Sequence, residues 1–280
     1  MPIHDQSYRH YAGRREAQGR AWIVIALAGI RNIIRKRLFI GLLLMAWVPF
    51  VVYAVQFYLA ATIPQASAFL APTAERFRGF FEWQGLFVFF ITVWVGAGLI
   101  ANDRRANALQ IYLSKPLARS EYVAGKLMIL VSFLLLVTWV PGMLLLVLQI
   151  AFAGNFAFVR ANPFVIPAIT LYSFLQVLVA SFTMLALSSL SKSGRYVAIL
   201  YAGAVLFSHA VFGVVSLVTR STSLSWLSFL ANLSQVGDVV FRLRPHYTTP
   251  WPVSVLAIAV LIAVSILILE RRVRGVEVVR

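Results

Sequence analysis

The side chains that most often perform chemistry in enzymes are few and scattered in this sequence. Cysteine is absent, which excludes disulfides, thiolate metal sites and cysteine nucleophiles. Gly125-Lys126 is followed by Leu127 rather than Ser or Thr, so it is not a phosphate-binding P-loop, and no Gly-x-Ser-x-Gly motif occurs. No two histidines have the spacing of a helical zinc motif: His4, His10, His209 and His246. We therefore predict that the chain is not an enzyme and holds no cofactor or metal of its own.

A few polar side chains fall inside long apolar runs, where they are candidates for lining a path through a membrane. Tyr53 and Gln56 are three residues apart in one run, and Gln176 and His209 each lie inside another. Polar groups in lipid are costly unless they face protein or a cavity. Ordinary hydrogen bonding between helices is the competing interpretation. No Asp, Glu, Lys or Arg lies in the middle of a predicted span, which favours an external energy source and an apolar or amphipathic substrate.

Composition and the spacing of charges place these residues in a membrane. Of 280 residues, 61% are hydrophobic and 12% are charged, against about 45–50% and about 25% in globular proteins. Six charge-free runs can each hold a helix that crosses a bilayer, which takes about 20 apolar residues. Transmembrane β-strands would instead give short alternating segments. The sequence predicts an all-α integral membrane protein with six transmembrane helices, near residues 38–61, 84–102, 127–151, 164–190, 196–219 and 253–270.

Three parts follow from this pattern: a cytoplasmic segment 1–37, a six-helix domain 38–270 and a tail 271–280. Within the first part, Arg20–Arg37 has apolar residues at helical spacing, with arginines at the edges. Its charge-free stretch Ala21–Ile30 is too short to cross a membrane, so we predict an amphipathic helix in the membrane interface. An early start of the first span is the competing interpretation.

The basic residues predict the orientation of the chain. An even number of spans puts both termini on one side, and the predicted segments on that side hold 19 of the 25 Lys and Arg residues. Because cytoplasmic loops are enriched in these residues, both termini should be cytoplasmic in the cell (inner) membrane. The net charge of +16 then reflects topology and contact with anionic membrane lipids rather than nucleic-acid binding.

The most polar stretch is 101–126, between the second and third predicted spans. The residues from Asp103 to Leu113 favour a short helix, and Pro116 ends it because the residue before a proline is disfavoured in helical geometry. A short helix, a proline break and a charged surface are typical of an element that docks on a cytoplasmic partner. An ordinary positively charged loop is the competing interpretation.

This stretch resembles a segment of one transporter family. Asp103-Arg104, the run from Leu113 to Tyr122 and Gly125-Lys126 are similar to the segment after the second span of ABC type-2 exporter permeases. The likeness covers the whole chain, and it is greatest to six-span permeases whose ATPase is a separate chain, such as the nitrous-oxide-reductase maturation permease group. That family usually has Glu and Gly-Thr where Asp103 and Asn107-Ala108 stand, which puts the subfamily in doubt.

The resemblance implies the membrane subunit of an ATP-binding cassette exporter with an apolar or amphipathic substrate. Two copies of a separate ATPase would bind ATP and Mg²⁺, and a second permease chain, identical or related, would complete the pore. Short external helices are expected within Arg220–Pro252. A secondary transporter or channel, and a non-transporting scaffold, stay open as alternatives. The resemblance places an ATPase-coupling loop and a second cytoplasmic contact on these residues: Asp103, Arg104, Arg105, Asn107, Leu109, Tyr112, Pro116 and Arg119; Lys192 and Arg195.

Overall fold

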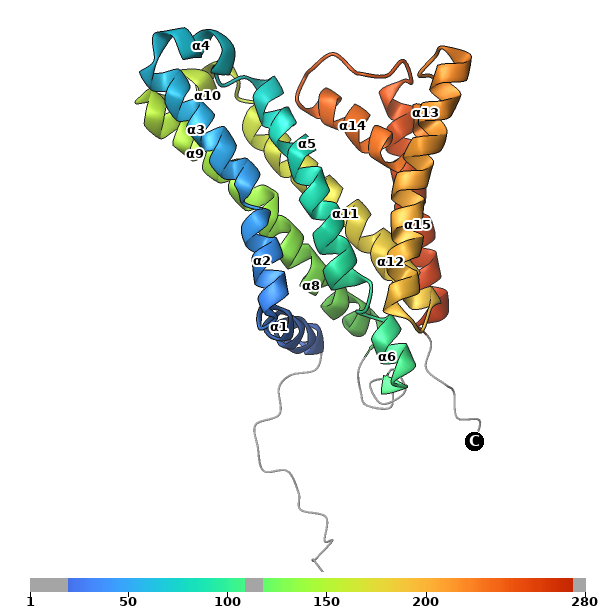
Figure 1. Ribbon diagram of the computed structural model, residues 1–280. Coiled ribbons are helices and arrows are strands. Elements are labelled where there is room, and N and C mark those ends of the chain that lie inside the picture. The colour runs from blue at the N-terminus through green and yellow to red at the C-terminus, as the bar shows by residue number, and fades with distance from the viewer. Residues whose placement is uncertain (1–19, 109–117, 274–280) are drawn as a thin grey trace, which may run out of the picture.

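The computed structural model describes residues 20–108 and 118–273, and every regular element in these ranges is a helix (Figure 1). Six helical stretches are long and apolar enough to cross a membrane, and the shorter apolar helix α1 (Ala21–Ile34) precedes them. The predicted all-α fold with six spans is confirmed. The six stretches are Arg37–Thr62, Ala74–Arg105, Arg119–Ala153, Val165–Leu190, Gly194–Thr219 and Trp251–Arg272.

Two spans are interrupted close to a proline. The first consists of α2 (Arg37–Met45) and α3 (Val48–Thr62), with Pro49 in the first turn of α3. The third consists of α8 (Arg119–Val137) and α9 (Trp139–Ala153), which holds Pro141. Proline lacks the backbone N–H that continues a helix, so a break just before it has a direct physical cause.

The second span begins ten residues earlier than predicted. It starts with α5 (Ala74–Ile91), continues through the π-helical η1 (Thr92–Gly96) and ends with α6 (Ala101–Arg105). Thr73 caps α5, since its hydroxyl accepts a hydrogen bond from the backbone N–H of Arg76 at 3.2 Å. The prediction of a loop here was wrong because it treated charged residues as a sign of loop structure.

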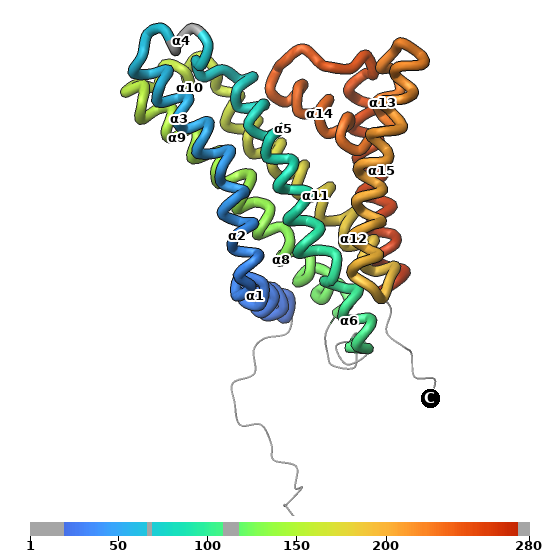
Figure 2. The backbone as a smooth tube through the Cα atoms, in the orientation of Figure 1, coloured from blue at the N-terminus to red at the C-terminus, as the bar shows by residue number. Residues whose placement is uncertain are grey.

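Two arms of helices diverge from one end of the molecule (Figures 1 and 2). One arm holds α2–α3, α8–α9 and α5, and the other holds α15 (Trp251–Arg272) and the fifth span. The helix α11 (Val165–Leu190) crosses between them and packs against both α8 and α15. The fifth span consists of three helical segments: α12 (Gly194–Ala202), the π-helical η2 (Gly203–Phe207) and α13 (Ser208–Thr219).

Short helices lie at the end where the two arms are farthest apart, here called the α14 end. The 3₁₀ turn η3 (Ser225–Leu227) and α14 (Phe229–Val240) connect the fifth and sixth spans, as predicted, and α14 lies between α5 and α13 (Figure 1). Two further short helices, α4 (Pro64–Leu70) and α10 (Ala157–Ala161), lie at the same end. The opposite end carries α1 and α6 and is called the α6 end.

The helix α1 packs closely along α8 at the α6 end. Its side chains Ala26 and Ile33 are buried, while Arg31 and Arg35 are exposed, which agrees with the predicted amphipathic helix. The contact depends on Gly125 of α8, because a Cβ atom there would lie 2.8 Å from the side chain of Ile25. Helix α1 is therefore held in place by close packing at Gly125 and not only by the intrinsic helix propensity of its residues.

We expect Gly125→Ala to weaken the packing of α1 on α8. The added methyl group would also lie 3.0 Å from the carbonyl oxygen of Trp22, and overpacking of this kind costs about 1–3 kcal/mol. The thermal unfolding midpoint of the purified chain should fall. Gly41→Ala in α2 is the control, because nothing lies within 4 Å of its new methyl group. Equal midpoints for the two variants would contradict this packing.

Candidate functional site

The predicted coupling helix is interrupted near its start. The helix α6 ends at Arg105, and Asn107 has a φ of 52°, in the left-handed region that a continuous α-helix does not use. Asp103, Arg104 and Arg105 therefore form the end of the second span rather than the first turn of a separate helix running to residue 113. Leu109, Tyr112 and Pro116 lie outside the described residues, so their predicted role stays a prediction.

The side chain of Asp103 is held inside the molecule. Its carboxylate lies 2.7 Å from the Lys126 ammonium group and accepts a hydrogen bond of 2.7 Å from the Tyr122 hydroxyl, both on α8. Both contacts of the Asp103 carboxylate join α6 to the third span. Asp103, which is 19% exposed, thus anchors α6 to α8.

A second anchor ties α6 to α11. The Ser188 hydroxyl accepts hydrogen bonds of 3.1 Å from the backbone N–H groups of Ile100 and Ala101, where the helix of the second span is interrupted. The guanidinium of Arg104 donates to the carbonyl oxygen of Ser189. Ser188 satisfies backbone donors that the interrupted helix leaves free, and the two serines together fix α6 to α11.

The two predicted contact segments lie beside each other. The helices α6 and α12 are in contact, and a Cβ atom on Gly194 would lie 3.4 Å from Cα of Gly98. The α6 end therefore presents one charged surface rather than two separate loops. Its exposed cations include four of the residues predicted to contact a partner: Arg105, Arg119, Lys192 and Arg195.

A buried ion pair lies near the α14 end. Arg78 of α5 is 3% exposed and Asp238 of α14 is fully buried, with 3.2 Å between Nε and Oδ1. Nη2 of Arg78 also donates to the hydroxyl of Ser234 at 2.9 Å, and the guanidinium lies 5.1 Å from the centre of the Tyr172 ring. Arg78 lies in the helix of the second span but before the predicted start of that span at residue 84, and Asp238 lies between the fifth and sixth spans.

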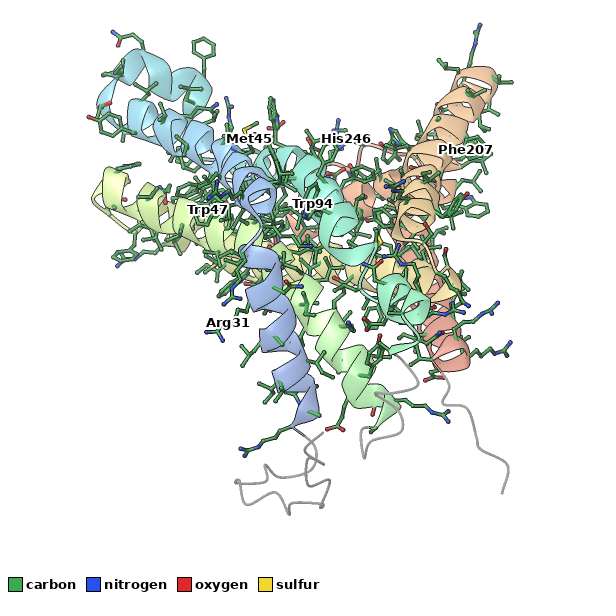
Figure 3. All side chains as sticks on the ribbon, turned by 60° about the horizontal axis from the view of Figure 1, so that its bottom comes forward. Arg31, Met45, Trp47, Trp94, Phe207 and His246 are labelled. Carbon is green, nitrogen blue, oxygen red and sulfur yellow. The ribbon has the colours of Figure 1, made fainter. Side chains whose placement is uncertain are left out.

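Asp238 also organises the turn that follows α14. Its second carboxylate oxygen lies 2.7 Å from Nδ1 of His246 and accepts a hydrogen bond of 3.1 Å from the backbone N–H of the same residue. Gly237 makes room for the pair, because a Cβ atom there would lie 2.6 Å from Nε of Arg78. Figure 3 shows His246 between the two arms, whereas Phe207 points away from them.

Two cavities meet at this ion pair, and both are lined by Arg78 and Glu82. The larger, of about 710 Å³, is mostly polar, and the smaller, of about 480 Å³, is mostly apolar. Glu82 lies one helical turn after Arg78, is 50% exposed, and approaches the guanidinium to 3.3 Å. Other charged or polar residues of the larger cavity are Tyr53, Glu75, Arg76, Arg244 and His246.

Three of the four predicted path-lining residues border these cavities. Tyr53 lines the larger one, and Gln176 and His209 line the smaller one. His209 also contacts the Ser228 hydroxyl at 3.0 Å. Gln56 does not line either cavity, and instead its side-chain oxygen accepts a hydrogen bond of 3.3 Å from Arg76.

The sequence analysis missed the ion pair, although one signal for it was present. Arg78 and Glu82 have the i, i+4 spacing of a helical ion pair, and Thr73 with Glu75 is typical of a helix start. Nothing in the sequence linked them to Asp238, which is 160 positions further along.

Comparisons with known proteins do not identify a family. No family model matches the chain, and no curated protein is significantly similar to it. The resemblance to type-2 permeases therefore depends on the motif and architecture alone.

We expect Asp238→Ala to destabilise the protein strongly, since it leaves Arg78 buried without its counter-charge. Removing one member of a buried pair typically costs about 3–5 kcal/mol. Glu82→Gln removes the exposed carboxylate from the same arginine and should cost less than about 1 kcal/mol. Chemical unfolding of both variants measures the difference. A double variant, Arg78→Gln with Asp238→Asn, should recover part of the loss. Similar losses for the two single variants would show that burial does not distinguish the two carboxylates.

Proposed function

We propose that this chain is the membrane-spanning permease subunit of an ATP-binding cassette transporter, energised by a separate ATPase. The observation that carries the proposal is the cationic surface at the α6 end, where the segments around Arg105 and Arg195 lie side by side. A cytoplasmic subunit needs such a surface to act on the spans. The resemblance of 101–126 to the coupling segment of type-2 permeases supports the same role.

The anchors of α6 suggest how movement would reach the spans. Asp103 ties α6 to α8 through Lys126, and Ser188 ties it to α11. A partner that displaces α6 would therefore pull on two long helices rather than on a flexible loop. ATP and Mg²⁺ would be bound by two copies of that partner, and a second permease chain, identical or related, would pair with this one.

The predicted orientation places the α6 end on the cytoplasmic side of the cell (inner) membrane. The two cavities then lie toward the outer side. Their apolar and polar linings suit an apolar or amphipathic substrate. The interfacial helix α1, with exposed Arg31 and Arg35, would contact anionic lipids on the cytoplasmic side.

A secondary transporter is the second candidate, and the buried ion pair is the observation that favours it. Arg78 and Asp238 are ionisable groups beside a cavity, and such groups often mark proton or ion pathways in transporters. The two functions differ in their energy source. In sealed vesicles, transport that runs on a pH gradient without ATP would favour the secondary transporter.

We expect single cysteines to report this orientation, because the chain has none of its own. Lys192→Cys at the α6 end should be protected from a membrane-impermeant thiol reagent in intact cells. Asn155→Cys and Thr248→Cys, exposed at the α14 end, should be labelled. Labelling before and after permeabilisation is the measurement. Labelling of position 192 alone in intact cells would show that the chain has the opposite orientation.

We expect the purified chain to lack ATPase activity, and a complex isolated with its ATPase from native membranes to hydrolyse ATP. Arg105→Ala combined with Arg195→Ala should weaken that complex about tenfold or more, because charges at an interface core contribute about 2–5 kcal/mol. Both side chains are exposed, so the fold should be retained. Binding of the isolated ATPase to the permease in nanodiscs measures the effect.

The matched control is Arg220→Ala combined with Arg244→Ala, two exposed arginines of the α14 end. Because they lie at the opposite end from the proposed contact, they should leave association unchanged. Arg78 would be an unsuitable control, since it is buried. ATP hydrolysis by the chain alone, or equal association of both double variants, would contradict the proposed division of labour.

A further inference from the structure

The smaller cavity beside Glu82 combines apolar walls with one exposed charge. Side chains of α5, of the π-helical η2 and of α14 form its walls, including Leu86, Phe90, Leu206 and Leu230. Its volume of about 480 Å³ is in the range of cavities that hold small molecules. Its walls come from both arms, so a bound molecule would contact both.

Two charged side chains line this cavity, Arg78 and Glu82, and Arg78 also pairs with Asp238 outside the lining, so this group holds one cation and two carboxylates. Arg78 is almost fully buried and is already compensated by Asp238. Glu82 is half exposed, and its charge remains in addition to that pair. The same charges affect the pKa of Tyr247, which lines the cavity and lies outside the spans. Burial raises the pKa of Tyr247, and the carboxylates of Asp238 and Glu82 raise that pKa further against the opposing effect of Arg78.

Aromatic rings and an unsatisfied acceptor complete the lining. Phe89, Phe90 and Tyr247 contribute rings, whose faces attract cations. Gln176 is 5% exposed, and its side-chain oxygen has no hydrogen-bond partner within the described part of the chain.

We propose that this cavity binds a bulky organic cation, with Glu82 as its counter-charge and the rings of Phe89, Phe90 and Tyr247 around its apolar groups. The Gln176 oxygen would accept a hydrogen bond from a cation that carries an N–H group. As the cargo site of a transporter, the cavity depends on the function proposed above. Binding itself does not, because it needs neither ATP nor a partner subunit.

Two probes of nearly equal shape and opposite charge test the proposal: tetraphenylphosphonium and tetraphenylborate. Binding is measured by equilibrium dialysis to the full chain in nanodiscs of phosphatidylcholine, with empty nanodiscs subtracted to remove partition into lipid. We expect saturable binding of the cation and none of the anion. The sign of the charge then decides between this proposal and a general hydrophobic cavity.

Variants place the binding at the cavity. Glu82→Gln should lower the affinity for tetraphenylphosphonium roughly tenfold, because it removes the half-exposed counter-charge at the edge of an apolar cavity. Glu75→Gln is the matched control: an exposed carboxylate on the same helix that lines only the larger cavity. Gly85→Leu should abolish binding by filling the cavity, since a Cβ atom there meets only Gln176, at an ordinary 3.6 Å.

Three outcomes would overturn the proposal: preference for tetraphenylborate, equal affinities for the two ions, or full cation affinity in both Glu82→Gln and Gly85→Leu. Unchanged unfolding midpoints in these variants ensure that a loss of binding is not a loss of fold. If the cation fails to bind while an ATPase still associates, only the substrate class is wrong. If the cation binds and no ATPase associates, the transport function proposed above is wrong and the site remains.

Discussion

The buried pair of Arg78 and Asp238 joins the two arms at the α14 end, where they are farthest apart. Helix α14 connects the fifth and sixth spans, and α5 belongs to the other arm, so this pair holds together segments distant in the sequence. A charge removed from water is tolerated only with a partner and additional hydrogen bonds, here supplied by Ser234 and His246. Both cavities are bordered by the same arginine, and their shape therefore depends on this pair.

The opposite end is held by a different kind of contact. There α6 is fixed by the Asp103–Lys126 ion pair and by hydrogen bonds from the interrupted backbone to Ser188. These contacts involve neighbouring spans that also pack through a continuous apolar core, from Ile100 to Leu130 and Met184. The α14 end combines the buried charge with an aromatic cluster, in which Phe241 packs on Phe81 and Tyr172.

The spans were predictable because lipid demands long apolar helices, and runs without charge mark them directly. That criterion failed at Arg78, whose charge is neutralised by Asp238 rather than by water. Lys192 and Arg195, which were predicted to contact a partner, are exposed, and their role in that contact stays a prediction. The helix from Asp103 onward was not predictable, because helical propensity says nothing about the left-handed turn at Asn107. Long-range pairs and local turns both depend on neighbours that a sequence pattern does not contain.

Between the two ends, interruptions divide several of the long helices into shorter segments. The first and third spans break next to Pro49 and Pro141, and the second and fifth each contain a π-helical turn, η1 and η2. The two π-helical turns belong to neighbouring spans, and η2 supplies Leu206 to the wall of the smaller cavity. Helices bend most readily where the regular backbone hydrogen bonds are interrupted. A displacement of α6 would therefore be taken up at these positions, and it would change the separation of the arms while the ion pair limits how far they move apart.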